Sequence, residues 1–577
     1  MFVLGLSNMR DAAAAVVCDG RIVAAAEEER FVRQKHVTAL PVHAIRYCLR
    51  EAGVTLRDVE AIAVPWKYWT VGRRVRLALT AMLRSPQMFR VKGARSLERV
   101  SQEWKELFWL RRELTQRIGT VGRQPVFLDH HLCHAASSFL VSPFERAAIL
   151  VVDGASEADT TLMAVGEGAQ ITVLDRTPLP HSLGQFYAAM TAFLGFRPDY
   201  DEYIVMGLAA SGEPTFAAGL RREIVRLLPR GQFELNTRLL DFHLARAGLF
   251  AGEFVRLFGP PRQSSDEITQ RHRDVAASAQ LVLEEALLHL GRHLKRLTGA
   301  ESLCLAGGVA YNCVANGRLR AELGFKQVYV PPASGDSGAA LGAALWWTAR
   351  RGESPARSPL PHAYLGPQFG EDPCRVALER EGLVAEPLSD GQLFERVATE
   401  LARGRLVFWF QGRMEWGPRA LGNRSLLADP RREDMRELIN SKVKCREPFR
   451  PFAPSVIEDR AREFFDLSAP SPFMQFTVRV KASAKGIIPA VTHVDGTARV
   501  QTVTREANSR FYELLMEFGR LTGVPVLLNT SFNVREPIVC SPDDAVRCFL
   551  RTQVEWLVLG NLLVRQPALQ TVPVHES

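Results

Sequence analysis

A proline-rich stretch, residues 353–373, interrupts the chain and separates two long segments of mixed apolar and polar sequence. At 577 residues the chain is too long for one ordinary hydrophobic core, so two or three domains are expected. Proline-rich and polar stretches are typical of domain boundaries. The sequence therefore predicts a domain at residues 1–352, a linker at 353–373 and a second domain at 374–577.

The composition is that of an ordinary globular protein, with 47% hydrophobic and 23% charged residues. The net charge of +9 suits anionic small molecules as well as nucleic acid and does not decide between them. No apolar run approaches the length of a membrane-spanning helix, and the chain begins directly with an apolar strand. Nine cysteines without a Cys-x-x-Cys pair indicate reduced thiols. We therefore expect a cytoplasmic protein with no membrane partner.

The first domain begins with short strands and a helix. Asp19-Gly20 supplies the residues of a tight hairpin turn between two of the strands. Residues 70–120 are basic with helix-like apolar spacing, which favours a helical insertion covering the core. The expected strands are Val3–Leu6, Ala12–Val17 and Arg21–Ala26, and a helix is expected from Pro41 to Glu51.

Two further buried strands are predicted at Ala147–Val152 and Leu303–Ala306. The second runs into Gly307-Gly308 and then a helix, and a strand feeding a glycine loop and a helix start can hold a nucleotide phosphate. This repeated strand–hairpin–helix organisation suits an α/β core of the actin/Hsp70 ATPase type. Beyond the linker, Leu406–Phe410 and Val524–Leu528 read as strands that flank a basic block.

His130 and His134 are four residues apart, which places both imidazoles on one face of a helix. Such a pair more often caps a helix or packs in a core than binds a metal. Asp153 after a buried strand and Asp336 at a helix start would both be costly as unpaired carboxylates, and they make a metal site more plausible. Two imidazoles with two carboxylates would suit Fe(II), Mn(II) or Zn(II). We interpret His131 as structural or as support for the ligands.

The basic block, residues 411–455, sets cations among glycines, prolines and phenylalanines instead of alternating charge along a helix. Guanidinium groups in such a segment can surround a phosphate-rich ligand. Composition alone leaves a surface patch or a nucleic-acid site open, although no recognition-helix motif accompanies it. The cations set among these residues include Arg413, Arg419, Arg424, Lys442, Lys444, Arg446 and Arg450.

Several motifs, in order along the whole chain, resemble those of the NodU/CmcH-type O-carbamoyltransferases, which carbamoylate hydroxyls on antibiotics and nodulation factors. No one of these motifs is specific, but together they cover nearly the entire sequence. They are His130-His-Leu-Cys-His134-Ala135, Pro180-His-Ser-Leu-Gly184, Val205-Met-Gly-Leu-Ala209, Leu305-Ala-Gly-Gly-Val309, Gly335-Asp-Ser-Gly338, the basic block, Asp495-Gly-Thr-Ala-Arg-Val-Gln501 and Asn529-Thr-Ser-Phe-Asn-Val-Arg535.

The resemblance implies an actin/Hsp70-like first domain of the tRNA threonylcarbamoylation variety and a YrdC-like α/β second domain. It implies that carbamoyl phosphate and ATP give carbamoyl-adenylate and pyrophosphate in the second domain, and that a hydroxyl of a small-molecule acceptor then takes the carbamoyl group in the first. The matching activation residues are Arg419, Lys442, Arg450, Arg499, Asn529 and Ser531. The matching transfer residues are Lys35 near the carbamoyl-adenylate, Gly307, Gly308 and Asn312 on the nucleotide, and His130, His134, Asp153 and Asp336 on a divalent metal, usually iron.

The chain departs from the family at position 10, where Arg10-Asp11 stands in place of His-Asp and the histidine is the family's expected general base. Arginine stays protonated at neutral pH and cannot act as a base. Arg10 could instead stabilise phosphate charge or bind an acidic acceptor. Asp11 or another group could replace the base, and His36 is a candidate by sequence position only. An amine acceptor, a different acyl group and a non-catalytic nucleotide-binding paralogue also stay open.

Smaller features leave further questions. Ile204 replaces a family lysine. We expect surface ion pairs for Arg431, Arg432 and Arg436, and we assign Arg424 neither a structural nor a binding role. The helical insertion could support a homodimer.

Overall fold

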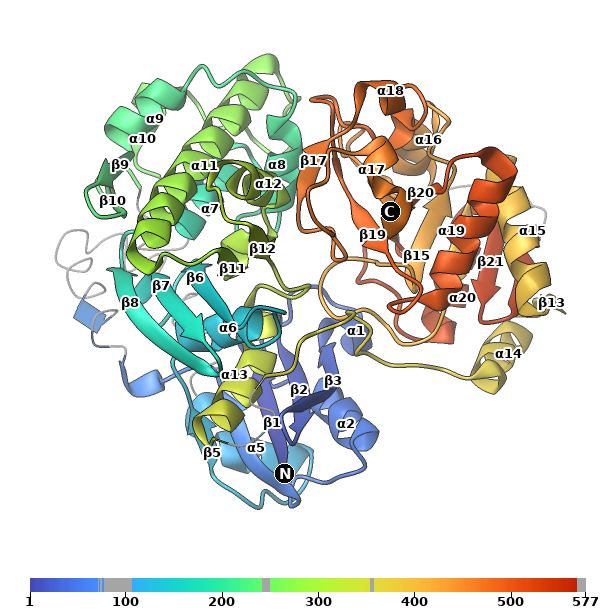
Figure 1. Cartoon of the computed structure of the whole chain (residues 1–577), viewed down its shortest axis with the longest axis horizontal. Helices are drawn as coiled ribbons and strands as arrows, with labels where there is room; N and C mark the ends of the chain where they lie inside the picture. The colour runs from blue at the N-terminus through green and yellow to red at the C-terminus, as the bar shows by residue number, and fades with distance from the viewer. Residues whose placement is uncertain (71, 73–74, 77–105, 241–249, 353–356, 568–577) are drawn as a thin grey trace. The chain divides into compact units, whose positions relative to one another are not determined.

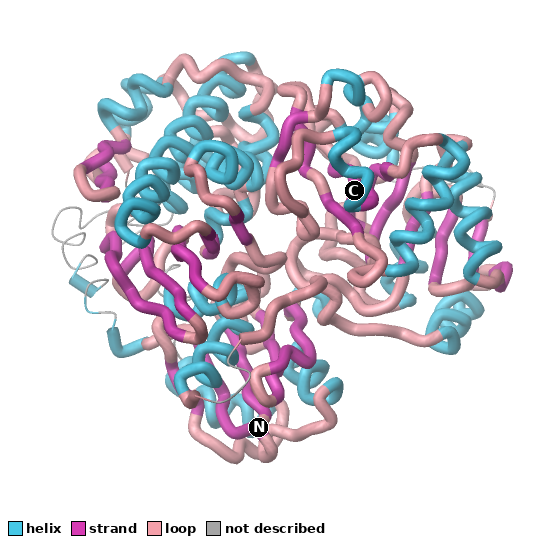
Figure 2. The backbone as a smooth tube through the Cα atoms, in the orientation of Figure 1, coloured by secondary structure: helices cyan, strands magenta, loops and turns pink. Residues whose placement is uncertain are grey.

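The computed structural model describes residues 1–70, 72, 75–76, 106–240, 250–352 and 357–567. The chain forms two compact units. Unit 1 comprises Met1–Leu360 with Gln475–Thr477, and unit 2 comprises Pro361–Met474 with Val478–Ser577. Both are mixed α/β, with helices packed against sheets (Figure 2).

Unit 1 begins with a five-stranded sheet in the order β3-β2-β1-β4-β5. Its first three strands are antiparallel, whereas β4 and β5 run parallel to β1. The three strands predicted near the N-terminus are confirmed, and Asp19 and Gly20 turn between two of them with φ of 47° and 76°. The strands are β1 Phe2–Ser7, β2 Ala13–Cys18, β3 Arg21–Glu27, β4 Val59–Val64 and β5 Pro125–Phe127.

A second five-stranded sheet repeats this topology, in the order β12-β11-β6-β7-β8. Here β6, β7 and β8 are antiparallel, and β11 and β12 run parallel to β6. The predicted strands at 147–152 and 303–306 are its two central strands. The strands are β6 Arg146–Val152, β7 Asp159–Glu167, β8 Gln170–Pro178, β11 Ser302–Ala306 and β12 Gln327–Tyr329.

Two helices, α6 (His130–Phe139) and α13 (Asp336–Arg350), pack against each other between these sheets (Figure 1). Helix α13 lies on β1 and β2, and α6 lies on β11 and β6. Glycine permits the close approach, because a Cβ at Gly5 would lie 1.9 Å from the Ala340 carbonyl oxygen and one at Gly342 would lie 1.9 Å from the Cys133 carbonyl oxygen. The two helices are thereby fixed with respect to both sheets.

Other helices complete unit 1, and the helix predicted at 41–51 is confirmed as α2. These elements are α1 Glu29–Val32, α2 Val42–Glu51, α5 Leu110–Arg117, α7 Leu183–Phe193, α8 Glu202–Ala209, α9 Ala217–Glu223, α10 Gly252–Phe258, α11 Gln270–Thr298, α12 Cys313–Glu322, 3₁₀ turns η1 Tyr68–Thr70 and η2 Gly308–Tyr311, and the hairpin β9 Val225–Leu228 with β10 Gln232–Leu235. Most of the helical insertion predicted at 70–120 lies outside the described residues. Of the apolar positions in that segment expected to cover the core, Leu107 and Leu110 are buried, whereas Phe108 is 57% exposed.

Unit 2 contains an eight-stranded sheet in the order β13-β22-β21-β14-β15-β20-β16-β19. Alternate residues of β14 face opposite sides, as strand geometry requires. Val407 and Trp409 join a core with α15 and α19, and Phe408 and Phe410 join a core with α14 and α20. The strands predicted at 406–410 and 524–528 are confirmed as β14 and β20, although β20 extends to Ser531.

The sheet strands are β13 Ala385–Pro387, β14 Val407–Phe410, β15 Arg424–Ala428, β16 Ala453–Ile457, β19 Gln501–Val503, β20 Val526–Ser531, β21 Trp556–Leu559 and β22 Leu562–Arg565. A separate pair is β17 Thr477–Arg479 with β18 Thr497–Arg499. The helices are α14 Glu371–Arg380, α15 Asp390–Ala402, α16 Met435–Lys442, α17 Ala461–Phe464, α18 Ala482–Lys485, α19 Ser509–Thr522 and α20 Pro542–Leu550, with 3₁₀ turns η3 Glu458–Arg460 and η4 Pro489–Val491.

The proline-rich stretch carries the boundary between the units, at Leu360. Its last three residues, which we expected to be linker, instead form the first turn of α14. Pro373 fits there because the first N–H groups of a helix need no partner within it. None of the helices in the described part of the chain is both long and apolar enough to cross a membrane.

Candidate active site

His130 and His134 lie on one face of α6, at its N-terminal end. The helix begins at His130 because the Asp129 side chain accepts a hydrogen bond from the Leu132 N–H at 3.0 Å and caps it. The four-residue spacing then brings the two imidazoles together, with their Nε2 atoms 3.1 Å apart. Both side chains are fully buried.

Two carboxylates complete this cluster. Asp153 follows β6, on which α6 packs, and Asp336 is the first residue of α13, which also packs on α6. The His130 Nε2 atom lies 3.3 Å from Asp153 Oδ2 and 3.5 Å from Asp336 Oδ1. The His134 Nε2 atom lies 3.8 Å and 3.5 Å from the same two oxygens. One donor atom from each of the four residues lies within 4.8 Å of the other three.

The cluster attracts positive charge. Burial alone would lower the pKa of His130, but hydrogen bonds and charges from Asp153 and Asp336 outweigh it and raise that pKa well above its ordinary value. The pKa of Asp153 is lowered in spite of burial, chiefly by its hydrogen bond with His130. With neutral imidazoles the four groups carry a net charge of about −2 in a buried space, and a divalent cation would neutralise it. The donor set therefore fits such an ion.

Neighbouring groups orient the candidate ligand His130, and the adjacent His131 is not a candidate ligand. The His130 Nδ1 atom lies 3.0 Å from the Pro65 carbonyl oxygen, which can only accept a hydrogen bond, so Nδ1 carries a proton and Nε2 is the nitrogen that can bind a metal ion once it is deprotonated. His131, which we expected to be structural or to support the ligands, is fully buried and is not one of the four clustered donors. Burial is the main cause that lowers the pKa of His131 well below its ordinary value, so it stays neutral.

The glycine loop after β11 borders this cluster. The Gly308 N–H donates a hydrogen bond to Asp153 Oδ1 at 2.9 Å. Gly307 has φ of 88°, and a Cβ there would lie 2.3 Å from the Val152 carbonyl oxygen, so only glycine fits. Asn312 caps α12 through the Ala315 N–H at 3.0 Å and also exchanges hydrogen bonds with Gln280. The structure thus places Gly307 and Gly308 beside the candidate ligand Asp153, whereas the contacts of Asn312 are with Gln280 and with the start of α12.

Arg10 and Asp11, in the loop between β1 and β2, have separate partners. Arg10 forms an ion pair with Asp199 at 3.3 Å and its guanidinium lies 4.8 Å from the centre of the Tyr200 ring. Burial acts to lower the pKa of Arg10, but Asp199 and Asp11 outweigh it and raise that pKa, so Arg10 remains a cation. Asp11 Oδ1 instead lies 2.6 Å from His36 Nδ1. Lys35, the neighbour of His36, is exposed.

In unit 2, the predicted activation residue Asn529 contacts sequence neighbours of two others, Arg419 and Arg499. The Asn529 amide nitrogen contacts Gln501 Oε1 at 3.0 Å, Ser455 Oγ at 2.9 Å and the Ala420 carbonyl oxygen at 3.4 Å. Arg419 precedes Ala420, and Arg499 lies two residues before Gln501. The remaining three predicted residues are Arg450, which pairs with Glu447 at 3.4 Å, Lys442, which is exposed at the end of α16, and Ser531, which ends β20.

Lys444 joins the basic block to β20. Its Nζ atom is buried and donates hydrogen bonds to the carbonyl oxygen of Ser531 at 2.5 Å and to the carbonyl and side-chain oxygens of Asn533 at 2.7 and 2.8 Å. In the sequence, Lys444 is simply one cation of the basic block. Nothing in the block distinguishes a buried lysine from an exposed one.

Arg424, to which the sequence assigned no role, is a structural cation. It is fully buried, its guanidinium lies 3.6 Å from the centre of the Phe410 ring, and it donates hydrogen bonds to the carbonyl oxygens of Gln411, Gly412, Asn423 and Pro367.

Ion pairs were expected for three other arginines, and two of these pairs are present. Arg431 pairs with Asp429 at 2.7 Å and Arg432 with Asp434 at 2.6 Å. Arg436 forms no ion pair within the described residues, so that expectation was wrong. Burial, with smaller contributions from the charges of Arg499 and Arg436, lowers the pKa of His493 to about 4.

Two family models together match most of the chain. The carbamoyltransferase N-terminus model matches residues 3–345 and the carbamoyltransferase C-terminus model matches residues 398–566. The chain belongs to the carbamoyltransferase family. The resemblance found in the sequence motifs is thereby confirmed, and the chain is a carbamoyltransferase.

Relatives of this carbamoyltransferase include nodulation proteins. Nodulation protein NolNO of Sinorhizobium fredii is 42% identical over 571 residues, which cover 97% of this chain and 79% of that protein. Nodulation protein U of the same organism is 31% identical over 562 residues, covering 92% and 94%. The crystal structure of full-length HypF in its phosphate- and nucleotide-bound form matches with a TM-score of 0.32 and 13% identity over 61% of this chain and 56% of that one, which is too weak to carry an argument.

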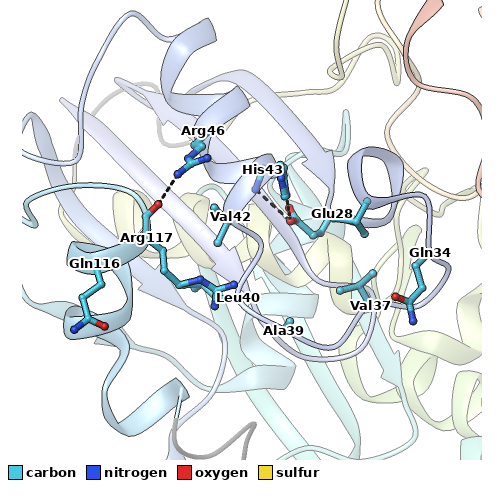
Figure 3. Close-up of a pocket in the computed structure, with 11 residues that line it drawn as sticks. Glu28, Gln34, Val37, Ala39, Leu40, Val42, His43, Arg46, Gln116 and Arg117 are labelled. Atoms are coloured by element: carbon cyan, nitrogen blue, oxygen red, sulfur yellow. Dashed lines mark hydrogen bonds and ion pairs between the residues drawn. The ribbon is translucent and has the colours of Figure 1, made fainter. Parts of the chain in front are cut away.

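A surface pocket of about 560 Å³ in unit 1 of this carbamoyltransferase is lined in part by Gln34 and Val37, which flank Lys35 and His36 in the sequence (Figure 3). It is lined by α2 and the loop before it, with Gln116 and Arg117 on the other side. Glu28 supports the start of α2, because its carboxylate accepts hydrogen bonds from the backbone N–H groups of His43 and Ala44 and lies 2.6 Å from His43 Nδ1. The pocket contains none of the predicted ligands or cations, so we do not assign it to the reaction.

Proposed function

We propose that this carbamoyltransferase works in two stages, activation of carbamoyl phosphate by ATP in unit 2 and transfer of the carbamoyl group to a small-molecule acceptor in unit 1. Membership of the family over both units supports the proposal. The observation that carries it is the convergence of His130, His134, Asp153 and Asp336, whose donor atoms lie within 4.8 Å of one another. Such a buried cluster suits the binding of a divalent metal beside a nucleotide.

In the first stage, water hydrolyses carbamoyl phosphate to carbamate and phosphate, and the carbamate oxygen then attacks the α-phosphorus of ATP and displaces pyrophosphate. The physical difficulty is to bring two polyanions together, and fixed cations overcome it by neutralising their charge. Arg419, Arg450 and Arg499 are the proposed cations, with Lys442 beside them and Asn529 and Ser531 as polar partners. We propose a YrdC-like role for the eight-stranded sheet, which carries Asn529 and Ser531 on β20.

In the second stage, unit 1 acts as an actin/Hsp70-like core of the threonylcarbamoylation variety. The duplicated sheet topology supports this assignment. Gly307, Gly308 and Asn312 would lie along the nucleotide, and Lys35 would lie near the carbamoyl group. An Fe(II), Mn(II) or Zn(II) ion bound by the four ligands would supply positive charge to the adenylate as AMP leaves. The chain's own contribution is to hold these ligands in a buried, preorganised arrangement.

The proposed acceptor is a hydroxyl of a small molecule. Arg10 cannot take its proton, since it is a cation paired with Asp199. The alternative of an amine acceptor is favoured by the same observation, because an amine needs less help from a base.

Release of pyrophosphate from ATP, with and without carbamoyl phosphate and with no acceptor, tests the proposal. We expect release that depends on carbamoyl phosphate and that falls strongly in Arg499→Gln. Arg432→Gln, which removes only the ion pair with Asp434, is the matched control and should behave as the unaltered protein. Absence of carbamoyl phosphate-dependent release from a protein that binds ATP would overturn the proposal.

A further inference from the structure

Three strained backbone positions lie in one cluster of unit 1. Asp11, His36 and Asp199 have φ of 58°, 53° and 66°, in the left-handed region that residues other than glycine seldom adopt. They come from the β1–β2 loop, the loop before α2 and the loop before α8. Tyr200 lies among them, since its ring centre is 4.6 Å from that of His36. Strain at several positions around one group of polar side chains is typical of functional sites.

Asp11 and His36 form a hydrogen-bonded dyad. The His36 Nδ1 atom lies 2.6 Å from Asp11 Oδ1, and both side chains are 27% exposed. An ionised carboxylate only accepts hydrogen bonds, so Nδ1 carries the proton and Nε2 holds the lone pair of the neutral ring. Within the described part of the chain, Nε2 makes no hydrogen bond. The dyad therefore presents an oriented base that a ligand can reach.

Other contacts hold the dyad in place. The His36 backbone N–H donates a hydrogen bond to Glu29 Oε2 at 3.1 Å, which fixes the loop. Tyr200 packs edge-on against the imidazole, and its own ring carries the guanidinium groups of Arg10 and Arg197, at 4.8 Å and 3.5 Å from the ring centre. The charged and titratable groups around His36 are thus Asp11, Glu29, Tyr200, Arg10 and Arg197.

Position 10 supplies a cation and no base. The next residue, Asp11, instead forms a hydrogen bond with His36. Arg10 pairs with Asp199 at 3.3 Å, and its guanidinium lies 4.8 Å from the centre of the Tyr200 ring. The loop that carries Asp11 joins β1 and β2, the two strands on which α13 lies, and the candidate metal ligand Asp336 is the first residue of α13. The dyad and this ligand are therefore carried by elements that pack against each other.

We infer that His36, oriented by Asp11, is the general base of carbamoyl transfer. This inference rests on the proposed function. As the acceptor oxygen forms its bond to the carbamoyl carbon, His36 Nε2 takes the hydroxyl proton, and the bond from that carbon to the phosphate oxygen breaks with its electron pair on AMP. The imidazolium then returns its proton to solvent. Asp11 is a positioning residue, which holds the tautomer and stabilises the charge that His36 acquires.

The geometry is tested without any acceptor, by NMR of the full chain containing ¹⁵N-labelled histidine. We expect His36 to be in the Nδ1–H form, and Asp11→Asn to abolish that preference. His43→Gln is the matched control, since His43 forms a similar 2.6 Å pair with Glu28 outside the cluster. A predominant Nε2–H form of His36 in the unaltered protein would overturn the inference.

The chemical role is tested with three nucleophiles, glycerol and water as hydroxyl probes and hydroxylamine as a nucleophile that needs no base. Pyrophosphate reports activation and AMP reports transfer. In His36→Gln we expect transfer to the hydroxyl probes to fall about 100-fold or more, with transfer to hydroxylamine retained and the dependence of the rate on pH lost. His43→Gln should match the unaltered protein. An unaltered protein that releases no pyrophosphate would refute the proposed function, whereas normal hydroxyl transfer by His36→Gln would refute only the base.

Discussion

The Nε2 atoms of His130 and His134 lie 3.1 Å apart, one helical turn from each other on α6. Two neutral imidazole lone pairs at that distance repel each other unless a proton or a metal ion lies between them. Asp153 and Asp336 add two carboxylate oxygens to the same space. The cluster therefore needs a positive charge, from either a proton or a metal ion. The first prediction tests whether a metal ion supplies it.

The double variant His130→Ala, His134→Ala should bind no stoichiometric metal. Both nitrogen donors are removed, and two carboxylates alone are weak ligands for Fe(II) or Zn(II). The measurement is metal content by elemental analysis after reconstitution with each ion, with folding checked by circular dichroism. His43→Gln removes a histidine from the same unit and should keep its metal. Full retention of metal by the double variant would refute the assignment of the four ligands.

Gly307→Ala should weaken metal binding by about 10-fold or more without unfolding the protein. Its Cβ would push on the Val152 carbonyl, which precedes Asp153, and would disturb the hydrogen bond from Gly308 to that carboxylate. Gly299→Ala is the matched control, because Gly299 also has positive φ, 58°, but open space around it. The metal affinity of each variant is measured by titration. Equal affinities would show that the glycine loop does not support the metal ligands.

Glu202 should make stability depend on pH. Burial is the main cause that raises the pKa of Glu202 to about 7, from an ordinary value of about 4.5. The folded state therefore holds this proton more tightly than the unfolded state, and stability is lost as pH rises from about 4.5 to about 7. Glu202→Gln has no proton to lose, so its melting temperature should rise relative to that of the unaltered protein between pH 5 and pH 8. A constant difference across that range would contradict the raised pKa.

Arg424→Met should destabilise unit 2 by about 3 kcal/mol, because it leaves several buried carbonyl oxygens without donors. Arg432→Met removes an ion pair near the surface and should cost less than about 0.5 kcal/mol. Urea denaturation followed by tryptophan fluorescence compares the two, since Trp409 and Trp416 are buried in the same unit. Similar midpoints for both variants would show that Arg424 is not structural.

Much of the fold could be predicted because local patterns agree with it. The apolar runs at residues 3–6 and 147–152 became the central strands of the two sheets, and Asp19-Gly20 turned where hairpin chemistry required it. The start of α14 at Glu371 was missed because proline reads as a helix breaker, although it is tolerated in a first turn.

Residue spacing predicted His130 and His134 as a pair, but it could not bring Asp153 and Asp336 to them. That needs the packing of α13 on α6, which depends on close approach at Gly342. The pairing of Asp11 with His36 was equally hidden, because it joins two loops through backbone conformations that no local pattern indicates. The burial of Arg424 and Lys444 could not be read from a block in which every cation looks alike.

The most direct test of the account is to follow the carbamoyl carbon. The protein is incubated with ATP and ¹³C-labelled carbamoyl phosphate without an acceptor, and the quenched mixture is analysed by mass spectrometry and nucleotide chromatography. The account predicts the label in carbamoyl-adenylate, with pyrophosphate formed in equal amount. Label confined to carbamoyl phosphate and carbamate, with ATP converted only to ADP, would contradict it.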